Sequence, residues 1–230
     1  MLSFPRPPFS AILLDLDGTI TDSAPGITDT LAFTFEQLGL PVPPLDELIH
    51  WVGPPIMESF TSRGGLDLPT AERALVIYRE RYLDRGAYDA TLFDDMGQLV
   101  RDIAEAGIPL SLATSKPEIP ATLMLEHFTI AHYFTVITGA SADEVRSAKA
   151  DVVAEALARL ESVGADLSNV VMVGDRIHDV EGAAAHGVPT IAVAWGYGTD
   201  AERAQAAAVA STTGELRSLL GLPAAVDPAV

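Results

Sequence analysis

The 230-residue sequence has no cysteine and few basic residues. Without cysteine the chain cannot form a disulfide, a thiolate metal site or a thiol nucleophile, which is consistent with a reducing compartment. Its 14 lysines and arginines stand against 32 acidic residues, so the formal net charge is -18. Nucleic acids and anionic membranes bind basic surfaces. We therefore predict a cytoplasmic protein that binds neither nucleic acid nor membrane.

Long apolar segments are also missing. Residues 1–10 hold three prolines and an arginine but no apolar core, so we expect no signal peptide. Residues 182–199 carry no Asp, Glu, Lys or Arg, yet they contain four glycines, a proline and a histidine. Because a membrane-spanning helix needs about 20 consecutive apolar residues, we predict a helix end, a turn and a buried strand for this stretch instead.

The composition is otherwise that of a chain with a sizeable core. Hydrophobic residues make up 48% of it, and 230 residues suit one domain with an insertion or two small domains. From Phe93 onward apolar β-compatible runs alternate with helical patterns, which predicts an α/β fold with a doubly wound parallel sheet. The predicted strands cover 11–14, 108–113, 134–138, 170–173, 189–194 and a short run near 208, and the predicted helices cover 94–106, 117–127, 147–163, 180–186, 201–208 and 214–220, with a frayed tail after 221.

The stretch from residue 21 to residue 89 has a different pattern. Ile27, Leu31 and Phe35 recur at helical spacing, and a later helix is predicted to start with Thr70 as its N-cap and to end near residue 85. Prolines and glycines separate these helical segments, and the stretch contains no strand-like run. We therefore predict two domains, an α/β core of residues 1–20 and 90–230 and an inserted helical domain of residues 21–89.

Two aspartates follow the first predicted strand. Asp15 and Asp17 stand one residue apart, before Gly18 and Thr19. A carboxylate at a strand end needs a partner, and open α/β sheets bind ligands at the carboxyl ends of their strands. If the chain turns at Gly18, one carboxylate and a nearby carbonyl can hold Mg²⁺ while the other carboxylate remains free for chemistry. The alternatives are a solvated acidic turn and an EF-hand loop, of which the second fails because its glycine belongs at the sixth position, not the fourth.

Polar residues also mark the second core strand and a later helix. The strand through Ala113 ends in Thr114 and Ser115 just before a helix start, where hydroxyls and free N–H groups bind phosphate oxygens. Ordinary N-capping is the alternative. Lys149 lies near the start of another helix, where the helix dipole disfavours a positive charge, which indicates a local purpose. A solvated surface lysine is the alternative for this position.

A third strand end carries two more acids. Gly174 and Asp175 close an apolar strand, and Asp179 follows four residues after Asp175. Residues at i and i+4 share one face of a helix, so both carboxylates are predicted to face the crevice that holds Asp15. Acids that cap a helix N-terminus are the alternative.

In this order the motifs resemble those of the haloacid dehalogenase (HAD) superfamily over about residues 11–194. The run 15–19, D-L-D-G-T, is similar to the phosphatase form of the first motif, and Thr114, Lys149 and the run 174–179 are similar to the other three. Ala150 stands where many members have proline, so Arg146 is a second candidate for the role of the lysine. The resemblance implies a Rossmann-like core with a C1 cap at 21–89, and the run 53–55, G-P-P, is similar to caps of phosphoglycolate-phosphatase-like members.

The resemblance also implies a reaction, the Mg²⁺-dependent hydrolysis of a small phosphomonoester such as phosphoglycolate. Asp15 would attack phosphorus to form an aspartyl-phosphate, and Asp17 would serve as general acid and base. Ionised, the four motif aspartates carry -4 against +1 on Lys149, so a phosphate dianion would be repelled without a divalent ion. The implied metal ligands are Asp15, Asp17, Asp175 and Asp179, and the implied substrate-binding residues are Gly18, Thr19, Thr114, Ser115 and Lys149.

Other functions remain open at this point. A phosphomutase would use the same residues, whereas a haloacid dehalogenase proper lacks the second aspartate and needs no Mg²⁺. A phospho-acceptor switch similar to a receiver domain also combines acids, Mg²⁺, a hydroxyl and a lysine, but this chain is long for one. The expected partner is a small phosphorylated metabolite, and the sequence predicts neither its identity nor the oligomeric state. Arg63, Arg79 and Arg81 are either ligands for a substrate carboxylate or solvated.

Overall fold

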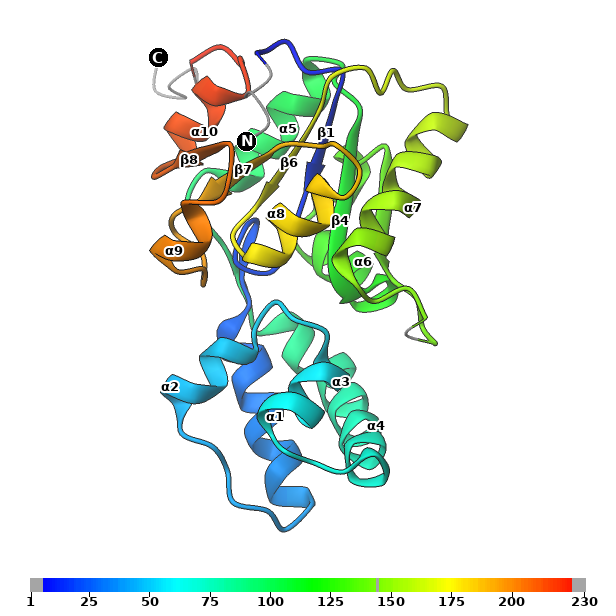
Figure 1. Cartoon of the computed structure of the whole chain (residues 1–230), viewed down its shortest axis with the longest axis vertical. Helices are drawn as coiled ribbons and strands as arrows, with labels where there is room; N and C mark the ends of the chain where they lie inside the picture. The colour runs from blue at the N-terminus through cyan, green and yellow to red at the C-terminus, as the bar shows by residue number, and fades with distance from the viewer. Residues whose placement is uncertain (1–5, 144, 225–230) are drawn as a thin grey trace.

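A computed structural model describes residues 6–143 and 145–224. Its centre is a six-stranded sheet with the order β5-β4-β1-β6-β7-β8, in which every neighbouring pair is parallel (Figure 1). The strands are β1 (Ala11–Leu14), β4 (Leu110–Pro117), β5 (Val136–Ala140), β6 (Val170–Gly174), β7 (Thr190–Val193) and β8 (Ala208–Ala210). The helices that connect and follow them are α5 (Met96–Glu105), α6 (Glu118–His127), α7 (Lys149–Ser162), α8 (Ile177–Ala184), α9 (Asp200–Arg203) and α10 (Thr213–Leu219).

The central strand β1 is apolar on both faces because helices cover both. Ile12 and Leu14 belong to the larger hydrophobic cluster, together with residues of α5 and α6 such as Leu99. Ala11 and Leu13 point the other way, since side chains alternate along a strand, and they join a second cluster with residues of α7 such as Val153. This arrangement confirms the predicted α/β, doubly wound, Rossmann-like core.

The segment between β1 and α5 is mainly helical and gathers below the sheet in Figure 1. It leaves and rejoins the core through a short antiparallel ladder of β2 (Thr21–Asp22) and β3 (Thr91–Leu92). Its elements are α1 (Ala24–Gln37), α2 (Leu45–Leu48), α3 (Ile56–Glu58) and α4 (Leu68–Asp84), with helical turns at Ile49–Trp51, Ser59–Arg63 and Gly86–Tyr88. We refer to residues 21–89 as the cap; its standing as a separate domain stays a prediction.

An aromatic cluster holds the cap helices together. Trp51, Phe35 and Phe60 meet edge to face or tilted, with ring centroids 5.8 to 6.4 Å apart. Phe60 also meets Tyr78 of α4, and Tyr78 stacks on Tyr82 one turn further along at 5.5 Å. Such pairs each add about 0.5–1.5 kcal/mol beyond the burial of their area. These rings belong to the same hydrophobic cluster as Ile12 and Leu14 of the core, so apolar contacts continue from the cap into the core.

The structure differs from the sequence-based expectations at a few boundaries. The predicted N-cap of the last cap helix, Thr70, is wrong: Asp67 caps α4 and its side chain accepts from the Thr70 N–H at 3.0 Å. The block at 21–89 was expected to contain no strand, yet Thr21–Asp22 forms β2. Strand β4 extends beyond Ala113 to Pro117. The end of the tail that was expected to fray, residues 225–230, lies outside the described residues.

No helix in the described ranges is both long and apolar enough to cross a bilayer.

Candidate active site

The loop after β1 places Asp15 and Asp17 at the end of the sheet that faces the cap. The N–H of Asp15 still donates to Val173 of β6, at 2.9 Å, which continues the ladder by one residue. The chain then turns tightly, and the Leu16 carbonyl accepts from the N–H groups of Ile20 and Thr21 at 2.9 and 3.0 Å. Gly18 adopts a φ of 82°, a conformation that residues with a side chain rarely adopt. The turn at Gly18 that the sequence predicted is therefore present.

Three buried carboxylates meet across two strand ends. Asp15 follows β1, Asp175 follows β6, and Asp179 lies in the first turn of α8; one oxygen from each lies within 4.8 Å of the others. Backbone donors fix this group, because Asp179 Oδ2 accepts from the N–H groups of Asp175 and Arg176 at 3.1 and 2.9 Å. Asp175 Oδ2 accepts from the Tyr197 N–H at 2.6 Å. Its other oxygen, Oδ1, has no hydrogen-bond partner among the described residues.

Lys149 lies against two of these carboxylates. Its ammonium is 2.8 Å from Asp15 Oδ1 and 2.7 Å from Asp179 Oδ1, and it donates to the Ala113 carbonyl at 3.0 Å. The aliphatic part of the lysine packs on α8 at Gly182, where a built Cβ would come within 2.7 Å of Lys149 Cγ. The lysine at the start of α7 is thus buried inside the acidic group and is not a solvated surface residue.

Asp17 has different surroundings from Asp15. Its Oδ2 pairs with the ammonium of Lys116 at 2.9 Å, and its Oδ1 accepts from the Ser23 hydroxyl at 2.5 Å. Lys116 also donates to the hydroxyl of Tyr82 on the cap, at 2.8 Å. The side chain of Asp17 is not a member of the three-carboxylate group. The structure therefore separates the two aspartates of the first motif, one beside the acidic group and one beside a lysine and the cap.

The predicted phosphate-binding residues lie around the same strand ends. Thr114 and Ser115 are buried in the last part of β4, and Thr114 Oγ1 accepts from the Lys116 N–H at 3.2 Å. Thr19 is fully buried, and its hydroxyl has no hydrogen-bond partner within the described part of the chain. An unsatisfied buried hydroxyl is costly, so a ligand oxygen is a natural partner for it.

Close packing at three glycines shapes the acidic group. A Cβ built on Gly18 would lie 2.4 Å from Asp175 Oδ2, and one on Gly196 would lie 2.3 Å from the Gly18 carbonyl oxygen. A Cβ on Gly174 would lie 2.2 Å from Asp179 Cγ. Contacts below 3.0 Å require atoms to move, so a side chain at these positions would displace the carboxylates.

Burial and mutual repulsion make the group electrostatically costly. Burial raises the pKa of Asp15 to about 6; Lys149 opposes this rise, and the charges of Asp179 and Asp17 add to it. Burial, followed by the charges of Asp179 and Asp15, raises the pKa of Asp175 well above its ordinary value. Burial alone would lower the pKa of Lys149, but Asp15 and Asp179 outweigh burial and raise it. A cation at the carboxylates would favour their ionised forms.

The donor set fits a hard divalent cation. The group offers carboxylate oxygens only, which Mg²⁺ prefers, and Asp175 Oδ1 is buried with no other hydrogen-bond partner in the described ranges. The four motif aspartates carry four negative charges if all of them ionise, and the ammonium groups of Lys149 and Lys116 carry two positive charges. The site would then have an excess of about two negative charges. A bound divalent ion would neutralise that excess, so Asp15, Asp175 and Asp179 are the residues that would hold it.

Three residues around the site were not found from the sequence. No sequence motif includes Lys116, although this residue follows Thr114 and Ser115 directly. Tyr197 bridges cap and core: its hydroxyl donates to Asp22 at 2.7 Å and accepts from the N–H groups of Ser23 and Ala24. Arg176 donates to the Val52 carbonyl of the cap at 2.7 Å. These roles depend on contacts between distant segments, which local spacing does not reveal.

Arg146, the alternative to Lys149, contacts Glu118 and the Gly139 carbonyl instead of the acidic group.

Comparison with known proteins agrees with this geometry. The sequence model of the haloacid dehalogenase-like hydrolase family matches residues 12–193. Among curated proteins, the tyrosine-protein kinase PtkA of Mycobacterium tuberculosis is 45% identical over 215 residues, covering 92% of this chain and 72% of its own. A 5'-nucleotidase of Pseudomonas aeruginosa is 37% identical over 191 residues, which cover 83% of this chain and 85% of the nucleotidase.

A phosphoglycolate phosphatase of Caulobacter vibrioides is 31% identical over 193 residues, covering 82% of this chain and 80% of its own. Among solved structures, a predicted phosphatase from Clostridium acetobutylicum superimposes with a TM-score of 0.86 at 35% identity, covering 93% and 99% of the two chains. The family match spans both strand ends that carry the aspartates. The chain belongs to the haloacid dehalogenase-like hydrolase family, and within it resembles the phosphoglycolate-phosphatase-like members.

Proposed function

We propose that this protein is a Mg²⁺-dependent phosphatase, active in the cytoplasm, that hydrolyses a small phosphomonoester through an aspartyl-phosphate on Asp15. The observation that carries the proposal is the meeting of Asp15, Asp175 and Asp179, two of which pair with Lys149, while Asp17 is held apart from them. Bound there, Mg²⁺ would supply charge stabilisation for the transferring phosphoryl group. The three carboxylates would hold the ion, and Asp17 would be a ligand through its backbone and not through its side chain.

Asp15 is the nucleophile in this proposal. Its carboxylate lies at the end of β1, is buried, and is oriented by the Lys149 ammonium at 2.8 Å. Attack by an Asp15 oxygen on phosphorus forms the acyl phosphate and breaks the bond from phosphorus to the leaving oxygen. Lys149 supports the step by holding a positive charge beside the nucleophile and the phosphate.

Asp17 is the general acid and base. Lys116 and Ser23 hold its carboxylate away from the acidic group, on the side that faces the cap. There it donates a proton to the leaving oxygen and later accepts one from the water that hydrolyses the acyl phosphate. The Thr19 and Thr114 hydroxyls and the backbone N–H groups at Gly18 and Ser115 are the proposed contacts for the phosphate oxygens.

The cap completes the site. The Arg176 bond to Val52 and the Lys116 bond to Tyr82 join it to the core beside Asp17. A cap that closes over phosphate excludes water from the reacting centre. We propose that this cap selects small phosphorylated metabolites, and phosphoglycolate is the first compound to assay because relatives at 28–31% identity carry that name.

The decisive experiment compares Asp15→Asn with a matched surface change, Asp84→Asn at the exposed end of α4. Release of inorganic phosphate from p-nitrophenyl phosphate is measured with Mg²⁺ and with EDTA. We expect Asp15→Asn to lose about a thousandfold or more, EDTA to abolish turnover, and Asp84→Asn to match the unaltered protein. Turnover that survives Asp15→Asn would refute the nucleophile. With a sugar phosphate as substrate, isomerisation without release of free phosphate would identify a phosphomutase instead.

A second candidate rests on the relative at 45% identity, which is named a tyrosine-protein kinase. In that case phosphate would pass from ATP to a tyrosine hydroxyl of a protein. Incubation with ATP labelled at the γ-phosphate separates the two functions. Label transferred to protein tyrosine and stable there supports the kinase, whereas label recovered only as free phosphate supports the phosphatase.

A further inference from the structure

The loop that follows β7 packs against the acidic group. Within this loop, residues 195–198, Trp195 donates from its indole Nε1 to the Thr19 carbonyl at 3.1 Å. The backbone of Gly196 lies so close to Asp175 that a Cβ built there would overlap the aspartate side chain. The 195–198 loop therefore touches both the turn after β1 and a carboxylate of the proposed cation site.

Tyr197 of this loop makes contacts in two directions. Its backbone N–H donates to Asp175 Oδ2 at 2.6 Å. Its hydroxyl donates to Asp22 Oδ1 at 2.7 Å and accepts from the N–H groups of Ser23 and Ala24, each at 3.0 Å. Asp22 ends β2 and Ala24 begins α1, at the point where the chain passes from the core into the cap (Figure 1). One residue thus joins a carboxylate of the proposed cation site to the first helix of the cap.

The Tyr197 hydroxyl takes the place of an N-cap side chain for α1. Ser23 is the N-cap residue, but its hydroxyl makes no capping hydrogen bond and donates to Asp17 Oδ1 instead, at 2.5 Å. The first N–H groups of a helix have no partner within the helix, so those of α1 depend on a core residue. Burial, followed by the hydrogen bond and charge of Asp22, raises the pKa of Tyr197 above its ordinary value. The hydroxyl therefore stays protonated and donates to Asp22.

The two oxygens of Asp175 have different surroundings. Oδ2 accepts from the Tyr197 N–H, whereas Oδ1 is buried and has no hydrogen-bond partner among the residues that the structure describes. A donor that holds Oδ2 also fixes the direction of Oδ1, and with it the geometry offered to a cation. Partners that hold a metal-binding side chain in this way typically change metal affinity by about 10–100-fold.

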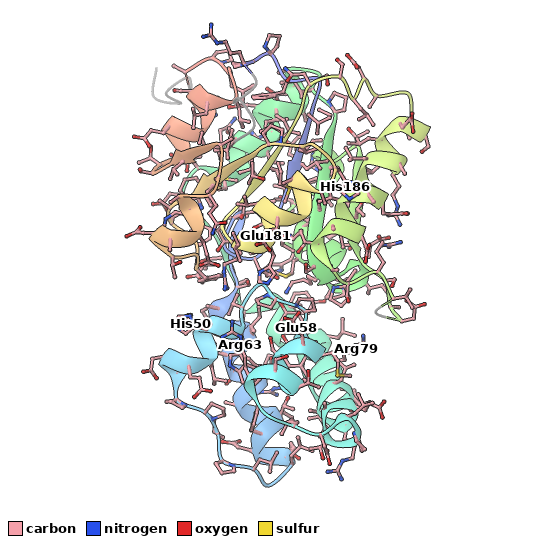
Figure 2. The ribbon with its side chains drawn as sticks, viewed as in Figure 1. His50, Glu58, Arg63, Arg79, Glu181 and His186 are labelled. Atoms are coloured by element: carbon pink, nitrogen blue, oxygen red, sulfur yellow. The ribbon has the colours of Figure 1, made fainter. Side chains whose placement is uncertain are left out.

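Other contacts between cap and core bypass the acidic group. Figure 2 shows Arg79 of α4 on the side of the cap nearest the core, where it donates to the Ala142 carbonyl at 3.4 Å. Tyr82 of the same helix accepts from Lys116 at 2.8 Å. Neither contact includes one of the three carboxylates, so neither joins the cap directly to the proposed cation site.

Arg176 forms a second connection of the same kind as Tyr197. Its N–H donates to Asp179 Oδ2 at 2.9 Å, and its guanidinium donates to the Val52 carbonyl of the cap at 2.7 Å. Loss of the Tyr197 hydroxyl should therefore weaken the connection between cap and acidic group without abolishing it.

We infer that Tyr197 is a positioning residue that couples the position of the cap to the affinity of the acidic group for a divalent cation. Asp22 and the start of α1 hold the Tyr197 hydroxyl, and the Tyr197 N–H in turn holds Asp175. When the cap moves away, the hydroxyl loses these partners and Asp175 loses a fixed donor. Linkage is reciprocal, so cation binding also favours the cap position seen here. The inference rests on the proposed function only through its cation site.

The first test removes the hydroxyl and keeps the backbone donor. Tyr197→Phe retains the N–H that binds Asp175, so a role confined to that N–H predicts no change. We expect calorimetric titration with Mg²⁺ to give a Kd about three- to tenfold higher for Tyr197→Phe, a part of the effect that such partners have. Tyr88→Phe, at a 44% exposed tyrosine of the cap, is the matched control and should bind like the unaltered protein. An unchanged Kd in Tyr197→Phe would overturn the inference.

A second readout follows the cap itself. Hydrogen exchange of peptides from α1 is measured with Mg²⁺ and with EDTA, and needs no turnover. If Tyr197 only capped the helix, Tyr197→Phe would speed exchange in α1 equally in both conditions. Coupling predicts instead that Mg²⁺ slows exchange in α1 of the unaltered protein and has a much smaller effect in Tyr197→Phe. The same Mg²⁺ effect in both proteins, or none in the unaltered protein, would contradict the coupling.

A double-mutant cycle assigns the effect to the contact with Asp22. Asp22→Ala also removes a negative charge, which by itself weakens cation binding, so the single variant is not sufficient. If the coupling acts through the hydrogen bond between Tyr197 and Asp22, the double variant should lose less Mg²⁺ affinity than the product of the two single losses. Losses that multiply in full would show that the two residues act separately, and would overturn the coupling.

Release of phosphate from p-nitrophenyl phosphate, measured in parallel, separates this inference from the proposed function. Mg²⁺ affinity that depends on Tyr197 in a protein that releases no phosphate would refute the phosphatase and support the coupling. Phosphate release together with a Mg²⁺ affinity that is indifferent to Tyr197→Phe would support the phosphatase and overturn the coupling.

Discussion

Replacing Asp175 by asparagine should stabilise the metal-free protein. Asp175 is 1% exposed, and Asp15 and Asp179 contribute two further carboxylates within 4.8 Å. Asparagine has the same shape, can still accept from the Tyr197 N–H, and offers an amide N–H₂ to the neighbouring carboxylates. The substitution removes one buried negative charge from a group that has an excess of them.

The size of the effect follows from the burial of Asp175 itself. Burial, followed by the charges of Asp179 and Asp15, raises the pKa of Asp175 well above its ordinary value. Because a shift of one pKa unit corresponds to about 1.4 kcal/mol, we expect Asp175→Asn to raise the free energy of unfolding in EDTA by about 1–3 kcal/mol. Mg²⁺ should stabilise the unaltered protein, by about 2.7 kcal/mol at a hundred times its Kd, and should stabilise the variant much less.

The dependence on pH has a definite sign. A carboxyl whose pKa is higher in the folded state than in the unfolded state favours folding at low pH, and this contribution is lost as the pH rises through about 6. In EDTA the unaltered protein should therefore lose stability between about pH 4 and pH 6, the interval between the unfolded and folded pKa of Asp15, and Asp175→Asn should lose less.

Urea unfolding with and without Mg²⁺, with Asp84→Asn as the control, measures these quantities. A variant that is less stable than the unaltered protein in EDTA, or that Mg²⁺ stabilises to the same extent, would refute the reasoning.

Two further predictions concern residues around the acidic group. Lys116→Met should lower kcat by about 10- to 100-fold, which is part of what a positioned general acid supplies. The loss should be smaller for p-nitrophenyl phosphate, because its leaving group needs little protonation. An equal loss for alkyl and aryl esters would contradict the role of Lys116 beside Asp17. Gly196→Ala should destabilise the protein by about 1–3 kcal/mol and weaken Mg²⁺ binding, because its Cβ would lie 2.3 Å from the Gly18 carbonyl oxygen. Gly214→Ala, whose Cβ would meet only Thr212 Oγ1 at 3.8 Å, is the control in thermal unfolding and metal titration.

The convergence of the acidic residues could be predicted from the sequence because topology determines it. Asp15 and Asp175 each follow an apolar run, and the carboxyl ends of parallel strands meet at one edge of a sheet. The pairing of β1 with β6, Leu14 opposite Val173, brings these two residues together. Lys149 could also be singled out, since a lysine opposes the dipole at the start of α7.

The contacts between cap and core could not be predicted in this way. Lys116 binds Asp17 and Tyr82, which lie far from it in the sequence, so no local spacing indicates the contact. Strand β2 has two residues, too few for any periodicity. At α4 the prediction placed the cap at Thr70, but the Asp67 carboxylate accepts from the Thr70 N–H, so Thr70 is the donor and Asp67 is the cap.

The most direct test of the account is to find the phosphoryl group on the protein. Acid quenching during turnover of p-nitrophenyl phosphate, followed by digestion and mass spectrometry, identifies the modified peptide. The account predicts phosphate on the peptide that contains Asp15, present with Mg²⁺ and absent with EDTA or in Asp15→Asn. Phosphate on another residue, or steady turnover without any phosphorylated peptide, would contradict it.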